Sequence, residues 1–503
     1  MVIAAYACGM LAVGWYYSRR NVTTEGYLLG GRRMRPLSVG LSLFATLLST
    51  ISYLSWPGEI IKHGPMMMCM WVTHPLTFLV VGWGVIPWIM KLRVTSAYEI
   101  LEVRFGLAVR MLGSVFFLCL RLLWMAVIIY ATASKVLVPM LGLEESVTPY
   151  ICAVMGLITV VYTSMGGLRA VVLTDVIQTA ILFGAAILTL GIITWQMGGP
   201  CAWWPTHWPE HWPDPTWGYD PTVRVTFLGA ALCSFTWWVC TSGSDQMAIQ
   251  RYLATRDTKA ARRVLLTSLT CDVLVGAFLC VLGLALLAYF RCHPLMLPEG
   301  ETLMTDPDRL FPHFIMVRLP AGLSGLVVAG LLAAAMSSLS SGVSSSCSII
   351  TVDFIDRFRK SAQGEADHVR LAKFVSAVVG VGVVVLSCYV GVVKGNLAEI
   401  AGKVVNLLVT PLAGLFFMAM FIRWATSFGT IVGAAVGLVA AFTINYWQEM
   451  GLHEVTGYHG ISWMLTMPVA LTIQMAAGMV ASLIPIGGGR PRTRPWTDGT
   501  WVS

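Results

Sequence analysis

Long apolar segments with few charges recur along almost the whole chain, and this pattern constrains its fold more than any other feature. Hydrophobic residues make up 57% of the sequence and charged residues only 12%, whereas soluble domains carry about 25% charged residues. Because backbone groups in lipid must be satisfied within the segment, apolar spans of this kind form helices. The sequence predicts an all-α polytopic membrane protein in the lipid bilayer, with about 13 transmembrane helices. The predicted spans cover residues 2–17, 37–61, 66–90, 108–141, 148–164, 172–195, 225–249, 264–290, 321–349, 371–391, 397–421, 428–447 and 462–485.

Lysine and arginine are distributed unevenly between the two sets of predicted loops. The loops after the odd-numbered spans and the C-terminal tail hold most of them, including Arg19, Arg20 and the 251–263 cluster. Cytoplasmic loops carry such an excess, so we expect the N-terminus outside and the C-terminus inside, in the cell (inner) membrane. The net charge of +8 reflects this asymmetry and does not indicate nucleic-acid binding. No basic residues precede the apolar start, which argues against a cleaved signal peptide.

Two further features are the cysteines, most of which lie inside the predicted spans, and one of the predicted loops. The 12 cysteines show no metal-binding spacing, and most are interpreted as small packing residues. Cys201 and Cys292 lie in predicted outside loops, where they could pair. The 196–224 loop is rich in Trp and Pro. Aromatic residues gather at membrane interfaces, so this loop is either an interfacial cap or an aromatic vestibule for a substrate.

A cluster of serines follows the apolar run that begins span 321–349. Helical spacing places Ser337, Ser340 and Ser341 along one stripe, with Ser338 beside it. Each hydroxyl needs a partner in hydrocarbon, because no water is available there. Neutral oxygen atoms suit a weakly held hard cation better than a transition metal. The alternative is close helix packing through small residues.

Two predicted spans contain residues that interrupt helices. Span 37–61 includes Pro57 and Gly58, and span 225–249 includes Gly243 among polar residues. Each of these spans begins a group of five, and an odd number inverts the second group relative to the first. Inverted repeats with interrupted helices are a design of transporters, which bind solute and ions near the middle of the membrane. A proline kink without function is the alternative.

Arg121 and Asp175 are charged side chains inside predicted spans, where charges are costly and therefore candidates for function. The planar guanidinium of Arg121 suits a carboxylate, which could belong to a substrate or to an internal acid; snorkelling is a third option. Asp175 could coordinate a cation or relay protons, and an ion pair with Arg169 is its structural alternative.

The order and spacing of four segments resemble those of the sodium/solute symporter family. These segments are 30–34, 166–178, 245–253 and 333–341, the last followed by Asp353. The resemblance covers roughly residues 20–430. It implies a LeuT-like core of two inverted five-helix repeats. The implied parts are an N-terminal helix and cytoplasmic loop (1–36), the first repeat (37–195), the Trp/Pro-rich outside loop (196–224), the second repeat (225–421), and two additional helices with a short tail (422–503).

The resemblance also implies positions for the ion and substrate sites. The main sodium site would combine backbone carbonyls and hydroxyls of Ala45, Leu48, Ala334, Ser337 and Ser338. A second sodium, held by some members, would use Asp175, Ser340 and Ser341. The substrate candidates are Ser49, Ser52, Trp71, Arg121, Thr241 and Ser242.

The expected function is sodium-coupled import of a small polar solute by alternating access, with Na+ as the coupling ion. Arg121 favours an organic anion, such as a monocarboxylate or an acidic sugar. A neutral sugar, polyol or amino acid is the alternative substrate, and proton coupling through Asp175 or Asp272 is the alternative mechanism. A sodium-dependent sensor would usually carry an appended cytoplasmic domain. We do not expect an enzyme, because no metal motif or nucleophile–base group stands out.

Overall fold

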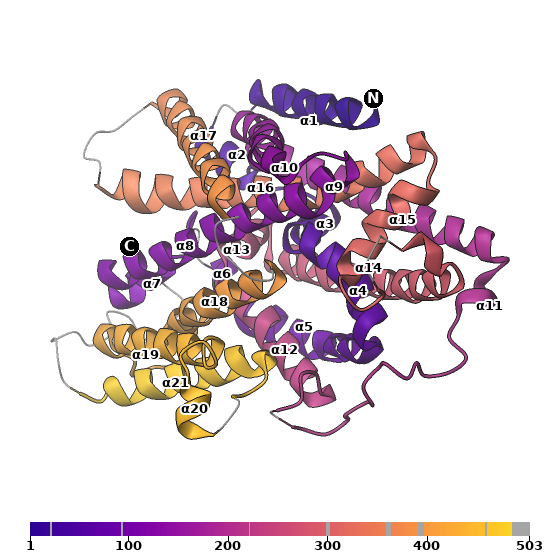
Figure 1. Ribbon diagram of the computed structural model, residues 1–503. Coiled ribbons are helices and arrows are strands. Elements are labelled where there is room, and N and C mark those ends of the chain that lie inside the picture. The colour runs from indigo at the N-terminus through magenta and orange to yellow at the C-terminus, as the bar shows by residue number, and fades with distance from the viewer. Residues whose placement is uncertain are drawn as a thin grey trace.

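The computed structural model describes residues 1–20, 23–91, 94–220, 222–297, 302–358, 364–390, 397–457 and 460–484, without the side chains of 321 and 397–404. These residues form helices and loops, and no strand occurs among them (Figure 1). Every predicted span coincides with helical structure. The all-α prediction is therefore confirmed.

The first half of the chain runs from the N-terminal helix to the Trp/Pro-rich loop. Its elements are α1 (Val2–Ser18), α2 (Thr24–Leu29), α3 (Pro36–Leu47), α4 (Thr50–His63), η1 (Pro65–Thr73), α5 (His74–Leu79), η2 (Val80–Val85), α6 (Ile86–Lys91), α7 (Glu99–Phe105), α8 (Leu107–Thr132), η3 (Ala133–Leu137), α9 (Val138–Met140), η4 (Glu145–Val147), α10 (Thr148–Met197) and α11 (Pro200–Trp203).

The second half begins after that loop. Its elements are α12 (Phe227–Ser244), α13 (Gln246–Leu253), α14 (Thr258–Cys292), η5 (Pro294–Met296), η6 (Pro307–Arg309), α15 (Leu310–Arg318), α16 (Ala321–Ile349), η7 (Ile350–Asp356), α17 (Glu365–Tyr389), α18 (Leu397–Phe421), α19 (Ser427–Asn445), α20 (Leu452–Thr456), η9 (Trp463–Leu465) and α21 (Thr466–Ala481).

The number of spans depends on how interrupted helices are counted. Among the described residues, eight helical segments are long and apolar enough to cross a membrane, or nine if α3 and α4 form one span. The 50-residue α10 contains two predicted spans, because Gly167 interrupts its helical backbone with a φ of 57°. Only glycine adopts that conformation without strain. The count of 13 helices remains a prediction.

Both expected interruptions are present, but at different residues. The axes of α3 and α4 differ by 68°, and the break is at Leu48 and Ser49, whose backbones are extended. Pro57 lies inside α4. In the second repeat the break is at Asp245, and Gly243 is helical. The proline and glycine positions were therefore wrong: polar residues that cap the next helix, Ser49 and Asp245, mark the breaks.

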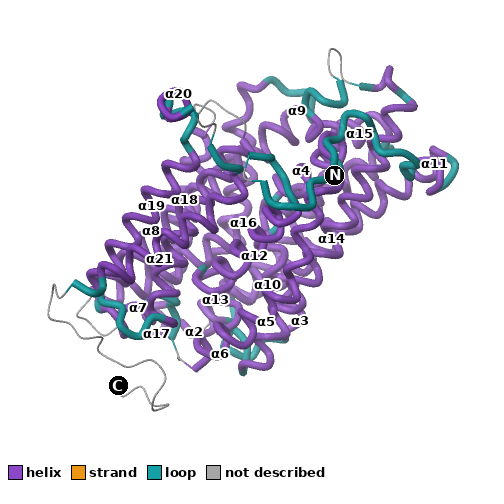
Figure 2. The backbone as a smooth tube through the Cα atoms, turned by 90° about the horizontal axis from the view of Figure 1, so that it is seen from below, coloured by secondary structure: helices purple, strands orange, loops and turns teal. Residues whose placement is uncertain are grey.

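The broken helices lie inside a bundle whose two ends differ. Figure 2 shows α11, α15 and α20 at one end, and α2, α6 and α7 at the opposite end. The serine-rich helix α16 packs against α10, α3 and α8. On the outside, apolar side chains such as Trp83, Trp195 and Val385 are exposed, as lipid contact requires. Cys201 and Cys292 are both free.

Candidate functional site

The serine stripe of α16 meets the broken end of α3. The Ser337 hydroxyl donates to the carbonyl of Ala45 across 2.5 Å. The Ser338 hydroxyl lies 3.1 Å from the carbonyl oxygen of Thr46 and 3.3 Å from that of Leu48. Both serines are buried. The structure thus brings together residues from two segments that the sequence analysis assigned to one ion site.

The break in α3 explains why these carbonyls accept hydrogen bonds from another helix. The last four carbonyls of a helix have no partner within it, and here the helix ends at Leu47. A small cavity, about 10 Å³ in volume, is lined by Ala45, Leu48, Ala334 and Ser337, among others. This volume corresponds to about one water-sized sphere. The lining of this space is almost entirely apolar, so the hydroxyl and carbonyl oxygens described above, and not this cavity, are the feature that suits a monovalent cation.

The candidates for a second ion site lie further along α16. Asp175 of α10 is buried and accepts hydrogen bonds from Ser42 (2.5 Å) and Ser341 (3.3 Å). The hydroxyl of Ser340 instead donates to the carbonyl of Ser337 within its own helix. Asp175 and Ser341 are therefore adjacent, as expected, whereas the Ser340 hydroxyl is directed elsewhere.

A buried arginine, which the sequence analysis missed, completes this cluster. The guanidinium of Arg251 lies 3.3 Å from the carboxylate of Asp175 and 2.5 Å from the hydroxyl of Ser341. The charge pattern of the sequence predicts that Arg251 belongs to a basic cytoplasmic loop, but its side chain is fully buried on α13. Arg169, the alternative partner of Asp175, donates to the carbonyl of Gly30. Every residue of α13, from Gln246 to Leu253, is buried, and no local pattern in the sequence marks this burial.

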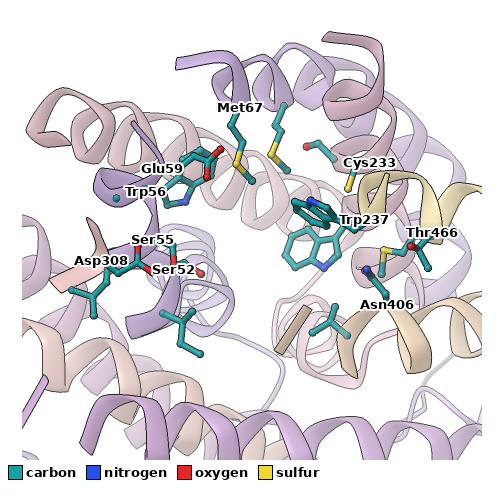
Figure 3. A pocket seen from close by; sticks show the side chains of 18 of the residues that line it. Ser52, Ser55, Trp56, Glu59, Met67, Cys233, Trp237, Asp308, Asn406 and Thr466 are labelled. Carbon is teal, nitrogen blue, oxygen red and sulfur yellow. The ribbon is translucent and has the colours of Figure 1, made fainter. Parts of the chain in front are cut away.

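A cavity of about 1090 Å³ lies beside the breaks. Figure 3 shows Ser52, Ser55 and Trp56 on one wall and Trp237 and Asn406 on another. Four of the six predicted substrate residues line this pocket: Ser52, Trp71, Arg121 and Thr241.

The other two predicted substrate residues do not line the pocket. The Ser49 side chain caps α4 by accepting from the backbone N–H of Ser52, and Ser242 is buried in α12. Ser49 therefore supports the break by capping α4, whereas Ser242 lies within α12, before the break at Asp245.

The charge of Arg121 is balanced inside the protein. Its guanidinium pairs with the carboxylate of Asp245, the residue at the break between α12 and α13. Both side chains are buried. Among the described residues, the Nε of Arg121 and the hydroxyl of Thr241 have no hydrogen-bond partner. Buried polar atoms are normally satisfied, so these two unpaired atoms, in residues that line the pocket, are unusual.

The mouth of the pocket is charged and faces the end that carries α15 and α20. Arg224 pairs with Glu59 through two contacts of 2.6 and 2.8 Å. Asp308 of η6 also lines the pocket. Burial, with the negative charges of Asp306 and Glu59 nearby, raises the pKa of Asp308 to about 6. Residues 197–220 do not line the pocket; instead the indole of Trp212 donates to the carbonyl of Ile61. This arrangement fits the interfacial cap and not the substrate vestibule.

The opposite end is held by a network around Asp353. Its carboxylate accepts from Arg110 (2.5 Å), Ser96 (2.9 Å) and Ser114 (2.5 Å). Arg110 also pairs with Glu102. Asp353 appeared in the sequence only as part of a motif, because its partners are more than 200 residues away in the chain.

Comparison with known proteins yields consistent matches. The model of the sodium:solute symporter family matches residues 27–437. The sodium/sialic acid symporter SiaT of Proteus mirabilis is 29% identical over 484 residues, covering 94% of this chain and 93% of the relative. A sodium-dependent multivitamin transporter of Oryctolagus cuniculus is 31% identical over 446 residues, covering 86% and 68%.

Solved structures agree with these sequence matches. An outward-open, substrate-bound structure of a Na+-coupled sialic acid symporter has a TM-score of 0.81 and 26% identity, and the match covers 96% of this chain and 97% of that one. A nucleobase-cation-symport-1 family transporter has a TM-score of 0.57 at 13% identity, covering 92% and 96%, which shows a shared fold. The LeuT-like core that the sequence predicted is confirmed.

Proposed function

Because the chain belongs to the sodium:solute symporter family, we propose that it couples the entry of Na+ to import of a small organic anion by alternating access. It is a membrane transporter and not an enzyme. The proposed ion site is supported by the hydrogen bonds between the Ser337 and Ser338 hydroxyls and the backbone carbonyls at the end of α3. We place the main sodium at Ala45, Leu48, Ala334, Ser337 and Ser338.

Sodium at this position would couple the two repeats. It would join the end of α3 to α16, and an ion stabilises only the conformation that binds it better. Entry of one positive charge is driven by about 2.3 kcal/mol per 100 mV of membrane potential. We propose an inner-membrane location with the N-terminus and the pocket mouth outside. The basic loops, including the segment after α13, then lie inside, as the positive-inside rule requires.

A second sodium near Asp175 and Ser341 is part of the same proposal. These oxygens are adjacent, and one carboxylate oxygen of Asp175 has no hydrogen-bond partner among the described residues. The guanidinium of Arg251 beside it repels a further cation. We therefore expect this ion to bind more weakly than the first, with Ser340 joining only after its hydroxyl rotates.

The anionic substrate is supported by Arg121 and by the relatives. A substrate carboxylate at the pocket face of Arg121 would share the guanidinium with Asp245. Relatives named for sialic acid and for monocarboxylates support the choice of an acid. A neutral or zwitterionic solute is the second candidate, because the Arg121–Asp245 pair already balances the charge of the site.

Uptake into proteoliposomes separates these candidates. We would load vesicles with potassium and compare external sodium with choline at constant pH, using matched carboxylates and their amides. Carboxylate uptake that requires sodium supports the proposal. Equal uptake in choline contradicts sodium coupling, and preferential uptake of the amides contradicts the anionic substrate.

A further inference from the structure

The large pocket is lined by an unusual number of tryptophans. Elsewhere in the described chain, tryptophans such as Trp15, Trp83 and Trp195 are exposed on the outside, where they suit the membrane interface. A second set faces the pocket and is therefore not available as membrane anchors. This set is Trp56, Trp71, Trp124, Trp237, Trp238, Trp447 and Trp463.

One wall of the pocket is a rigid aromatic surface. The rings of Trp56 and Trp71 are stacked, with centroids 5.1 Å apart and an angle of 28°. Helix α14 packs closely against Trp71, because a Cβ atom added at Gly276 would overlap the indole ring. Trp56 is half-buried and lines the pocket. A stacked pair supported in this way loses little conformational entropy when a flat group packs against it.

The facing wall on α12 carries a second aromatic surface. Trp237 packs edge-on against Trp238, with ring centroids 5.1 Å apart. Trp238 in turn contacts the ring of His74 and is almost fully buried, whereas Trp237 is half-buried at the pocket. Figure 3 shows Trp56 and Trp237 on different walls, with Met67 between them and Cys233 nearby. The space between these walls is thus bordered by aromatic and soft apolar groups.

The polar groups of this region are the indole N–H groups and neutral side chains such as Ser52, Ser55, Thr241 and Asn406. The indole N–H groups of Trp56, Trp71 and Trp237 donate to no described residue, so each can meet a single acceptor atom. At the mouth, Glu59 and Arg224 satisfy each other. A buried hydroxyl needs a hydrogen-bond partner, and the flat apolar faces of the indoles offer none to a group that lies directly against them. A flat ring with one or two acceptor atoms fits them better.

From these observations, and resting on the proposed transport of an organic anion, we infer the substrate class. The substrate is a carboxylate that carries a planar aromatic or heteroaromatic ring. The carboxylate meets Arg121, and the ring packs against the indole of Trp56 on the side that faces Trp237. The pocket volume of 1090 Å³ accommodates such a molecule, since ligand pockets commonly measure about 300–1000 Å³.

The test measures binding to the purified full-length protein in sodium, by calorimetry and by thermal stabilisation. The probes are indole-3-acetate, its amide, acetate and N-acetylneuraminate. We expect indole-3-acetate to bind at least about 10-fold more tightly than each of the other three, from ring packing and the charged contact together. Trp56→Leu should weaken the binding of indole-3-acetate by on the order of 3- to 10-fold. Trp56→Phe should retain most of the affinity because it keeps a planar ring.

Control variants distinguish a local effect from misfolding. Trp195→Leu changes an exposed tryptophan that does not line the pocket and should not alter binding. Trp237→Leu tests the second wall if Trp56→Leu does not fold. Equal binding of acetate or N-acetylneuraminate, or equal losses in the Leu and Phe variants, would overturn the inferred ring. If no carboxylate binds in sodium while the amide does, the proposed anion transport itself fails.

Discussion

The side-chain oxygen of Ser337 lies 2.5 Å from the backbone carbonyl oxygen of Ala45, although 292 residues separate them in the chain. The contact exists because α3 ends at Leu47 and leaves its last carbonyls without partners in the helix. It ties the two repeats together at the proposed sodium site. A transport cycle that separates α3 from α16 must break it, and sodium in the same place would make that step depend on the ion.

Replacing Ser338 with Ala should raise the sodium concentration for half-maximal uptake by on the order of 10-fold, because one ligand oxygen is lost. The measurement is initial uptake at varied sodium. Ser346→Ala is the matched control, since Ser346 is buried on the same helix and its hydroxyl has no partner among the described residues. An unchanged sodium dependence in Ser338→Ala would remove this serine from the site.

Arg121→Gln should abolish carboxylate uptake but also destabilise the protein by about 3–5 kcal/mol, because Asp245 would be left as an unpaired buried charge. The double variant Arg121→Gln/Asp245→Asn has no such charge and should recover most of the thermal stability. Uptake should stay absent in it. Restored carboxylate transport in the double variant would show that Arg121 serves structure and not substrate.

Asp353→Asn should lower the thermal midpoint clearly, since Arg110 loses its buried partner. Breaking a buried ion pair costs about 3–5 kcal/mol. Asp367→Asn provides the comparison, because its pair with Arg370 is exposed and such pairs contribute at most about 1 kcal/mol. Similar midpoints for both variants would contradict a stabilising role for the Asp353 network.

The pocket-mouth acid Asp308 should make stability depend on pH. Its pKa is raised from 3.8 to about 6 by burial and by Asp306 and Glu59, so the folded state binds its proton more tightly than the unfolded state. Stability is then lost as the pH rises from about 4 to 6, by on the order of 2–3 kcal/mol. Asp308→Asn should raise the thermal midpoint at pH 7.5 and leave it unchanged near pH 4. The same shift at both pH values would contradict this titration.

Gly276→Ala should displace the ring of Trp71 in the aromatic wall of the pocket. The added methyl group would overlap the ring of Trp71, and overpacking of this kind costs about 1–3 kcal/mol. We expect a lower thermal midpoint. Gly184→Ala on α10 adds a methyl group in open space and is the control. Equal midpoints for the two variants would show that Trp71 can move at little cost.

Much of the architecture was predictable from local sequence. The length and apolarity of segments set the helices, because lipid leaves the backbone no other partner. The serines of α16 and the polar stretches near 49 and 245 marked the ion and pocket region. The exact breaks were missed, since Pro57 and Gly243 are tolerated inside helices, whereas Ser49 and Asp245 stop them by capping the helices that follow.

The sequence by itself determined that this chain is helical, membrane-embedded and built around two interrupted helices, because those properties depend on residues close together in the chain. Only the tertiary structure decided which buried charges meet. Arg121 pairs with Asp245, and Arg251 with Asp175, across separations that no local pattern records. The aromatic walls of the pocket likewise arise where α4, η1 and α12 come together. A side chain's partner depends on three-dimensional packing, and that packing determines whether a charge or a ring is available to a substrate.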